Sequence, residues 1–241
     1  MKISFRILLI NFVIVALIFI SSTIAFYTLT KKIILFQNTK VLSNSVSDFS
    51  LAFGSVLQDT ENDFLNLLAG GKLSGDLGLS GNVEIEKYKL DFIFTLNPDS
   101  SLNPDFFFFK PSVIYSGVSD FNSFVSNNPG ALIKEYRTRQ GNTYFFGRIL
   151  TEDLLDNLSK KIRADVAVFS DNIPVVCSNS DKNQDIIGSL IQAISESSSG
   201  NFKKQDIITK ELDDLDLYAS LILLNKYGFK NSDKQLLIFY A

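Results

Sequence analysis

Histidine and tryptophan are absent from this 241-residue sequence, and cysteine occurs once, at Cys177. Without histidine there is no Ser-His-Asp triad and no Cys-His pair, and a single cysteine cannot form a disulfide within the chain. The absence of histidine and the presence of only one cysteine also exclude a zinc site built from these residues. We therefore expect no metal site and no cofactor. A hydrolase would have to use a serine–lysine pair, and we expect this chain not to be an enzyme.

Net charge is also small. The chain has 23 basic and 26 acidic residues, a balance of −3 that gives no indication of a nucleic-acid partner. Charged residues make up 20% and hydrophobic residues 46%, which is enough to form a sizeable core. Residues 1–40 contain five basic and no acidic residues, which leaves 18 basic and 26 acidic residues in 41–241. The N-terminal end therefore differs in kind from the acidic remainder.

An apolar run near the N-terminus, from Ile7 to Ala25, contains 19 residues and no charge. As a helix it would be about 28 Å long, close to the ~30 Å hydrocarbon core of a bilayer. A cleaved signal peptide would have an apolar core of only ~7–15 residues and a small-residue cleavage site, which residues 22–26 fit poorly. We therefore predict a membrane-spanning helix over residues 7–27.

Basic residues on both sides of this run bear on its orientation. Lys2 and Arg6 favour a cytoplasmic segment at residues 1–6, whereas Lys31 and Lys32 on the other side weaken the bias. We expect a single-pass protein of the inner (cytoplasmic) membrane with its main domain in the extracytoplasmic or periplasmic space.

Helix breakers are rare after the apolar run. There is no proline before Pro98, and Gly54 is the only glycine before Gly70. This pattern predicts a stalk helix over residues 28–69 that continues out of the membrane, followed by a glycine-rich loop at 70–82.

Apolar residues recur at heptad spacing along the predicted stalk. They occupy the two seam positions at Leu35, Leu42, Phe49 and Val56, and at Val46, Phe53 and Leu67. The repeat fits an amphipathic helix that lies on its own domain, or a seam with a partner helix in a homodimer. Both interpretations can hold on one helix, with the domain contact near the membrane and the partner helix further out.

Short apolar runs with alternation follow the loop and predict an α+β domain over residues 83–230, an antiparallel sheet flanked by helices. The expected strands are Leu90–Leu96, Ser112–Ser116, Leu132–Arg139, Thr143–Leu150, Ala164–Ser170, Pro174–Ser178, Asp206–Lys210 and Leu217–Asn225. Thr151 is expected to cap a helix whose buried stripe is Leu154, Leu155, Leu158 and Ile162. A second helix would bury Ile186, Ile187, Leu190, Ile191 and Ile194.

The order of elements within residues 146–179 is a strand, a short helix, an Ala-Asp-Val strand at 164–166, a tight turn at 171–174 and a paired strand. This order resembles the PAS-like Cache sensory domains found outside the membrane in bacterial receptors such as sensor histidine kinases, cyclases and chemoreceptors. Asp91–Asp99 resembles the first sheet strand and turn of those domains. The resemblance implies a sensor domain of a signal-transduction receptor, including those of two-component systems. The Arg, Trp, Tyr and Asp set of amino-acid-binding double Cache domains has no counterpart placed in this sequence.

The last segment, 231–241, begins with the N-cap residues Asn231, Ser232 and Asp233 and ends in six apolar residues. This pattern predicts the start of a C-terminal helix toward a second membrane segment in a longer protein. The alternative is a last strand or helix that packs on the core.

A hairpin turn is expected between the third and fourth strands, with Gly141 and Asn142 as its two central residues. In this register Arg139 faces Tyr144, Arg137 faces Phe146 and Glu135 faces Arg148, all on one face of the sheet. Paired guanidinium donors match a carboxylate, so a small anionic ligand is the expected partner. The candidate ligand-binding residues are Arg137, Arg139, Tyr144 and Arg148.

The alternative for this hairpin is a solvated face with a Glu135–Arg148 pair across the strands. A pocket at this hairpin would need a cover, which residues 105–130 could supply.

Three other features are expected to have structural roles only. The acidic run at 211–216 is expected to form a solvated turn that binds no metal. Phe106–Phe109 is expected to form a buried strand, and Cys177 is expected to be a small core residue.

Two functions from different classes fit these features. The first is the signal-input region of a bacterial transmembrane receptor, which senses a small ligand or an envelope condition and relays it through the stalk helix. The second is a membrane-anchored structural or assembly protein that recruits a protein partner in the envelope. A ligand-sized pocket favours the first, and a flat apolar patch favours the second.

Overall fold

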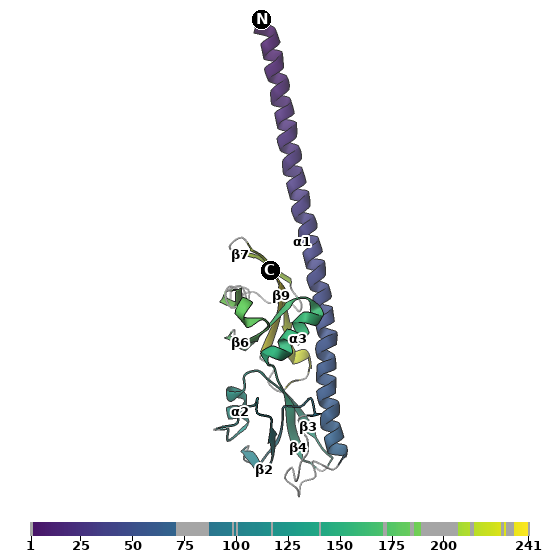
Figure 1. Ribbon diagram of the computed structural model, residues 1–241, viewed down its shortest axis with the longest axis vertical. Helices are drawn as coiled ribbons and strands as arrows, with labels where there is room; N and C mark the ends of the chain where they lie inside the picture. The colour runs from purple at the N-terminus through teal and green to yellow at the C-terminus, as the bar shows by residue number, and fades with distance from the viewer. Residues whose placement is uncertain are drawn as a thin grey trace.

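The computed structural model describes residues 2–70, 87–97, 99, 101–116, 118–139, 141–170, 173–183, 186–188, 207–212, 215–227, 229 and 234–240. It consists of one very long helix, α1, and two antiparallel sheets stacked along the second half of that helix (Figure 1). The predicted α+β class is confirmed, although the strands form two sheets and not the single sheet expected.

Helix α1 (Lys2–Ala69) runs without interruption, as the scarcity of glycine and proline predicts. Its first half projects away from both sheets and is exposed, including Phe12 at 72% and Phe36 at 70%. Among the described residues this is the one helix long and apolar enough to cross a membrane. The predicted membrane segment and the predicted stalk are therefore parts of a single helix.

The four-stranded sheet lies at the end farther from the N-terminus, with strand order β2-β1-β4-β3. Its strands are β1 (Phe92–Leu96), β2 (Leu102–Phe109), β3 (Ala131–Arg137) and β4 (Thr143–Ile149). Between β2 and β3 lies the short helix α2 (Phe121–Asn127). Asp120 caps it by accepting the Ser123 N–H bond, and the Ser123 hydroxyl accepts from the Asp120 N–H in return.

The five-stranded sheet lies nearer the N-terminal half of α1, with strand order β6-β5-β9-β8-β7. Its strands are β5 (Asp165–Ser170), β6 (Ile173–Cys177), β7 (Ile207–Leu212), β8 (Leu215–Leu223) and β9 (Lys234–Tyr240). Helix α3 (Glu152–Ile162) precedes this sheet, and the short 3-10 helix η2 (Leu224–Tyr227) follows β8. Thr151 caps α3 as predicted, and its predicted stripe is buried at Leu155, Leu158 and Ile162 and half-buried at Leu154.

The predicted C-terminal helix is wrong, because residues 234–240 form strand β9 in the middle of the five-stranded sheet. Here β9 pairs with β5 on one side and β8 on the other, and Ile238 and Phe239 have no exposed surface. A continuous apolar run suits a strand that is covered on both faces, and the run is too short by itself to distinguish the two states. The folded domain therefore extends beyond residue 230, the end predicted from the sequence.

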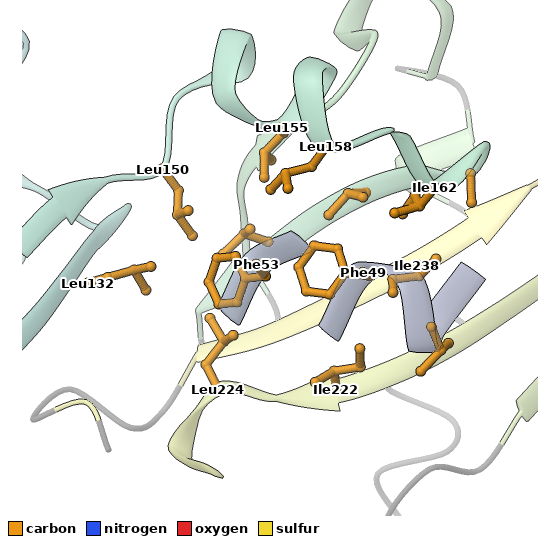
Figure 2. Close-up of a cluster of buried hydrophobic side chains, with 14 of the residues drawn as sticks. Phe49, Phe53, Leu132, Leu150, Leu155, Leu158, Ile162, Ile222, Leu224 and Ile238 are labelled. Atoms are coloured by element: carbon orange, nitrogen blue, oxygen red, sulfur yellow. The ribbon is translucent and has the colours of Figure 1, made fainter. Parts of the chain in front are cut away.

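The heptad residues of α1 pack against the molecule's own core between positions 42 and 67. Leu42, Phe49 and Phe53 are fully buried among residues of α3 and the five-stranded sheet (Figure 2). Further along the helix, the Phe64 ring stacks on Phe146 of the four-stranded sheet with centroids 4.0 Å apart. The domain-face interpretation is confirmed for this stretch, and these residues do not form a homodimer seam.

Most of the expected strands are present, with one exception. Residues 112–116 form turns and bends, while Leu102–Phe109 is a strand that pairs with β1. The strand interpretation of Phe106–Phe109 is thus confirmed. Of the second predicted helix only 186–188 are described, and they are helical. The glycine-rich loop, beyond residue 70, lies outside the described residues.

Candidate functional site

The predicted arginine face depends on the register of the β3–β4 hairpin, and that register is wrong. Arg137 lies opposite Thr143, and Tyr136 lies opposite Tyr144. Residues 138–142 connect the strands, with the Thr138 N–H donating to the Asn142 carbonyl at 2.9 Å and Gly141 at a φ of +91°. Because side chains alternate between faces, a longer turn with a register shift of three positions separates residues that were expected together.

The four candidate residues therefore do not form one cluster. Arg137 is exposed and donates from Nε to the Glu135 carboxylate at 2.7 Å, and Arg139 is exposed beyond the end of β3. On the opposite face, Tyr144 is only 4% exposed and packs near Phe64 of α1. Arg148 also lies on that second face, where it belongs to a charge cluster that the sequence did not reveal.

Asp91 is the centre of this charge cluster. Its carboxylate lies 3.4 Å from the Lys110 Nζ and 3.8 Å from the Arg148 Nε, and it accepts the Ile149 N–H at 2.9 Å. Lys110 also donates from Nζ to the Tyr88 carbonyl at 2.7 Å. The three charged side chains are 12–20% exposed and come from the ends of three strands. The cluster fastens the start of β1 to the ends of β2 and β4.

The face of the four-stranded sheet that points away from α1 is filled by aromatic rings. Phe94 packs against Phe124 of α2 with centroids 4.9 Å apart, and stacks on Phe145 at 5.4 Å. The covering segment is held by Asn128, which accepts the Ile114 N–H at 2.8 Å and donates to the Ile114 carbonyl at 2.7 Å. The predicted cover over this sheet is present, and what it covers is a packed aromatic cluster.

Carboxylates around the turn after β6 have structural partners. Asp165 accepts from the Asn179 amide Nδ2 at 2.7 Å, and Asp156 accepts the Asn179 N–H at 2.7 Å. The hydroxyl and N–H of Ser180 hold the pKa of Glu152 below its usual range. Within the part of the chain that the structure describes, no group of His, Cys, Asp or Glu side chains could hold a metal ion.

Cys177 lies next to this turn and is buried. Burial, followed by the nearby Asp165 charge, raises the pKa of its thiol to about 12, which keeps the thiol protonated. The prediction of a core residue without thiolate chemistry is consistent with this position.

A groove lies along one side of α1, at the level where the helix passes from one sheet to the other. Its volume is about 400 Å³, within the range of ~300–1,000 Å³ typical of small-molecule sites. It is lined by Gly54, Leu57, Gln58, Glu61, Asn62 and Leu65 of α1, by Lys134 of β3 and by Tyr227 of η2. The walls of the groove thus come from α1, from β3 of the four-stranded sheet and from η2, which follows β8 of the five-stranded sheet.

Charged and amide groups give this groove its polarity. The Lys134 Nζ lies 2.6 Å from the Glu61 carboxylate, and the two side chains are 25% and 48% exposed. Leu57 is nearly buried, and the Tyr227 ring packs edge-on against Phe53 with centroids 5.3 Å apart. The groove therefore combines one matched charge pair with apolar and amide walls.

Gly54 opens the groove at one end. A Cβ added at this position would meet no atom within 4 Å. Gly147 shows the opposite situation, because a Cβ there would lie 1.8 Å from the Leu132 carbonyl oxygen. Close packing thus requires glycine at 147 and does not require it at 54. The isolated glycine of a long helix was the one signal in the sequence that pointed to this site.

Comparison with solved structures gives distant likenesses to ligand-binding domains of receptors. An extracellular ligand binding receptor from Desulfohalobium retbaense is 9% identical with a TM-score of 0.42, and the match covers 86% of this chain and 40% of that one. The sensory domain of the Campylobacter jejuni chemoreceptor Tlp3 is 10% identical with a TM-score of 0.38, covering 84% of this chain and 90% of that one.

The ligand-binding domain of Mlp24 with asparagine is 11% identical with a TM-score of 0.32, covering 83% of this chain and 87% of that one. No protein-family model matches the chain, and no curated protein matches its sequence. The similar structures are thus described as sensory or ligand-binding domains. Because these TM-scores are low, none of the ligands in those structures is carried over to this chain.

Proposed function

We propose that this chain is the extracytoplasmic signal-input region of a bacterial transmembrane receptor. It binds a small ligand without catalysing a reaction and relays occupancy through α1. The observation that carries this proposal is the continuity of α1, which is exposed and apolar in its first half and buried against both sheets in its second. One rigid element therefore connects a membrane-spanning length of helix to the folded domain.

The groove beside Gly54 is the binding site in this proposal. Its lining comes from α1, β3 and η2, so a ligand would contact the helix and a segment associated with each sheet at once. A ligand that prefers one of two arrangements by about 1.4–3 kcal/mol shifts their ratio roughly ten- to 150-fold. Contact with all three elements gives a ligand that preference.

A homodimer near the membrane belongs to the same proposal. Ile33, Ile34 and Leu35 are 44–49% exposed and Phe36 is 70% exposed, so apolar side chains surround the helix just beyond Lys31 and Lys32. This segment precedes the first buried heptad residue, Leu42. We expect a second copy of α1 to pack here, which is where a homodimer seam remains available.

The orientation of the protein and the relay along α1 are tested by introducing one cysteine at a time into the full chain. The native Cys177 is buried, so it adds little background labelling. In intact cells, a membrane-impermeant maleimide should label Asn157→Cys and should label Ser4→Cys only after lysis. Oxidation should cross-link copies at one or two of positions 33–36 with helical periodicity. Labelling of Ser4→Cys in intact cells would place the domain in the cytoplasm and overturn the proposal.

A second function rests on a different observation. Ile114 and Tyr115 are 57% and 58% exposed on the segment that covers the four-stranded sheet. Neighbouring exposed apolar residues on a loop favour a protein partner, as expected for a membrane-anchored assembly factor. Capture of an envelope protein that depends on these two residues, with no ligand bound in the groove, would support this second function.

A further inference from the structure

We propose that the groove beside Gly54 binds a short peptide in an extended conformation. This inference rests on the proposed sensor function and names the chemical class of its ligand. It is carried by the length of the groove, the spacing of its amide groups, its matched charge pair and its one glycine.

The groove follows α1 over about three helical turns. Its α1 lining extends from Gly54 to Leu65, which at 1.5 Å per residue corresponds to about 16 Å along the helix axis. An extended peptide advances ~3.3 Å per residue, so about five residues span that length. A volume of about 400 Å³ spread over such a length suits a narrow chain better than a compact molecule.

The amide side chains of the groove match the repeat of an extended backbone. Gln58 and Asn62 are one helical turn apart on the same wall and exposed. Four helical residues rise about 6 Å, close to the ~6.6 Å after which an extended peptide presents equivalent groups on the same side. A carboxamide offers both a donor and an acceptor, so each of the two can pair with one peptide group of the ligand.

The charges of the groove select against simple ions. Lys134 and Glu61 already neutralise one another at 2.6 Å. A ligand with a single charge would have to break this pair before it could use either member. A peptide backbone is neutral, so it can lie along the groove without breaking the Lys134–Glu61 pair. Leu57 and Leu65 supply apolar surface for the side chains.

Gly54 allows the peptide to approach the helix backbone. Glycine is the poorest helix former after proline, and no packing contact within the chain requires it at this position. A side chain at 54 would project into the open end of the groove. Glycine at this position thus leaves open space beside the helix backbone, which a ligand can occupy.

The test uses the full-length protein in nanodiscs and two probes of the same composition. One is a tryptic digest of casein, and the other is the same digest hydrolysed completely to free amino acids. The digest should raise the Tm of the wild type in a saturable way, by about 5–10 °C at a hundredfold excess over Kd. The hydrolysate should have no comparable effect, and an equal shift from it would overturn the assignment to peptides.

Variants locate the binding. Gly54→Leu fills the groove and Lys134→Met removes one charge, and each should weaken the digest's effect at least tenfold. The matched controls are Ser55→Leu, at the neighbouring exposed position outside the lining, and Arg137→Met, on the other face of β3; both should respond as the wild type does. Circular dichroism without peptide confirms that each variant folds.

Three outcomes separate this inference from the proposed function. If the digest stabilises Gly54→Leu as strongly as the wild type and also alters cross-linking at positions 33–36, the sensor function stands and the groove is not the site. If the digest binds in the groove and cross-linking is unchanged, the groove assignment stands and the relay fails. Efficient disulfide formation between copies of Gln58→Cys without peptide would show that a second copy fills the groove, which overturns the inference.

Discussion

The two halves of α1 carry similar apolar side chains in opposite surroundings. Phe12 and Phe36 in the first half are 72% and 70% exposed, whereas Phe49, Phe53 and Phe64 in the second half have no exposed surface. The first half is apolar around its whole circumference, as expected of a helix surrounded by lipid. The second half places its apolar residues in a stripe and its polar residues opposite. The distribution of apolar residues around the helix, more than their number, determines which half enters the core.

The largest test of this comparison is Phe53→Ala against Phe36→Ala. Truncating a fully buried phenylalanine should lower the free energy of unfolding by about 3–5 kcal/mol, because it leaves a cavity among α3 and the five-stranded sheet. In detergent, the exposed Phe36 should change it by less than about 0.5 kcal/mol. Chemical denaturation followed by tyrosine fluorescence measures both, and equal losses would show that the exposed segment also packs on the domain.

A somewhat smaller effect is expected for Leu158→Ala on α3. This side chain is 1% exposed and lies in the same cluster as Phe49 and Phe53 (Figure 2). We expect a loss of about 2–5 kcal/mol in the free energy of unfolding. Asn157→Ala, at the adjacent exposed position, serves as the control and should have little effect. A loss below about 1 kcal/mol for Leu158→Ala would indicate that α3 does not pack on α1 as described.

Gly54→Ala tests the exposed side of the second half of α1. Unlike the two core variants, it should raise the free energy of unfolding. A methyl group at 54 meets no atom within 4 Å, and alanine favours a helix over glycine by about 0.5–1 kcal/mol. Without ligand the variant should therefore be more stable by that amount in the same denaturation assay. Destabilisation would mean that the helix needs glycine for its own geometry, which would remove the reason given for a ligand at this position.

The last expected effect is confined to alkaline pH and concerns Cys177. Burial raises the pKa of this thiol in the folded state to about 12, from an ordinary value of 9.0. Between those values the unfolded chain loses the proton and the folded chain keeps it, so stability should fall as pH rises from about 9 toward 12. The contribution of the thiol should be absent in Cys177→Ala, so the wild type should lose more stability than the variant over this range. At pH 8, a thiol reagent should modify Cys177 in the unfolded protein much faster than in the folded one.

The sequence allowed good prediction where local signals decide the structure. The unbroken α1 follows from the lack of helix breakers before Gly70, and α3 follows from the Thr151 cap and its apolar stripe. Most strands follow from alternation between turn residues. The heptad repeat showed correctly that one face of α1 is buried, but a periodic stripe does not distinguish a partner helix from the helix's own domain.

Features that depend on distant pairing were not predictable in the same way. The turn at 138–142 admits more than one register, and the choice is made by the packing of Tyr144 and Phe146 under α1. The Asp91 cluster and the groove each combine residues far apart in the chain. Only Gly54 gave a local sign of the groove, and that sign was weak because an isolated glycine in a helix has several possible causes.

The position of β9 affects the order in which the protein can fold. Strand β9 is the last in the sequence and lies between β5 and β8, so the five-stranded sheet has no centre until residues 234–240 have been synthesised. Until then the β5–β6 and β7–β8 hairpins have no hydrogen-bonded connection to one another, and the apolar stripe of α1 lacks part of its cover. Such long-range pairing slows folding. A nascent chain in which residues 234–240 have not yet been synthesised therefore has α1 complete and the five-stranded sheet unfinished, a state in which chaperones have time to act.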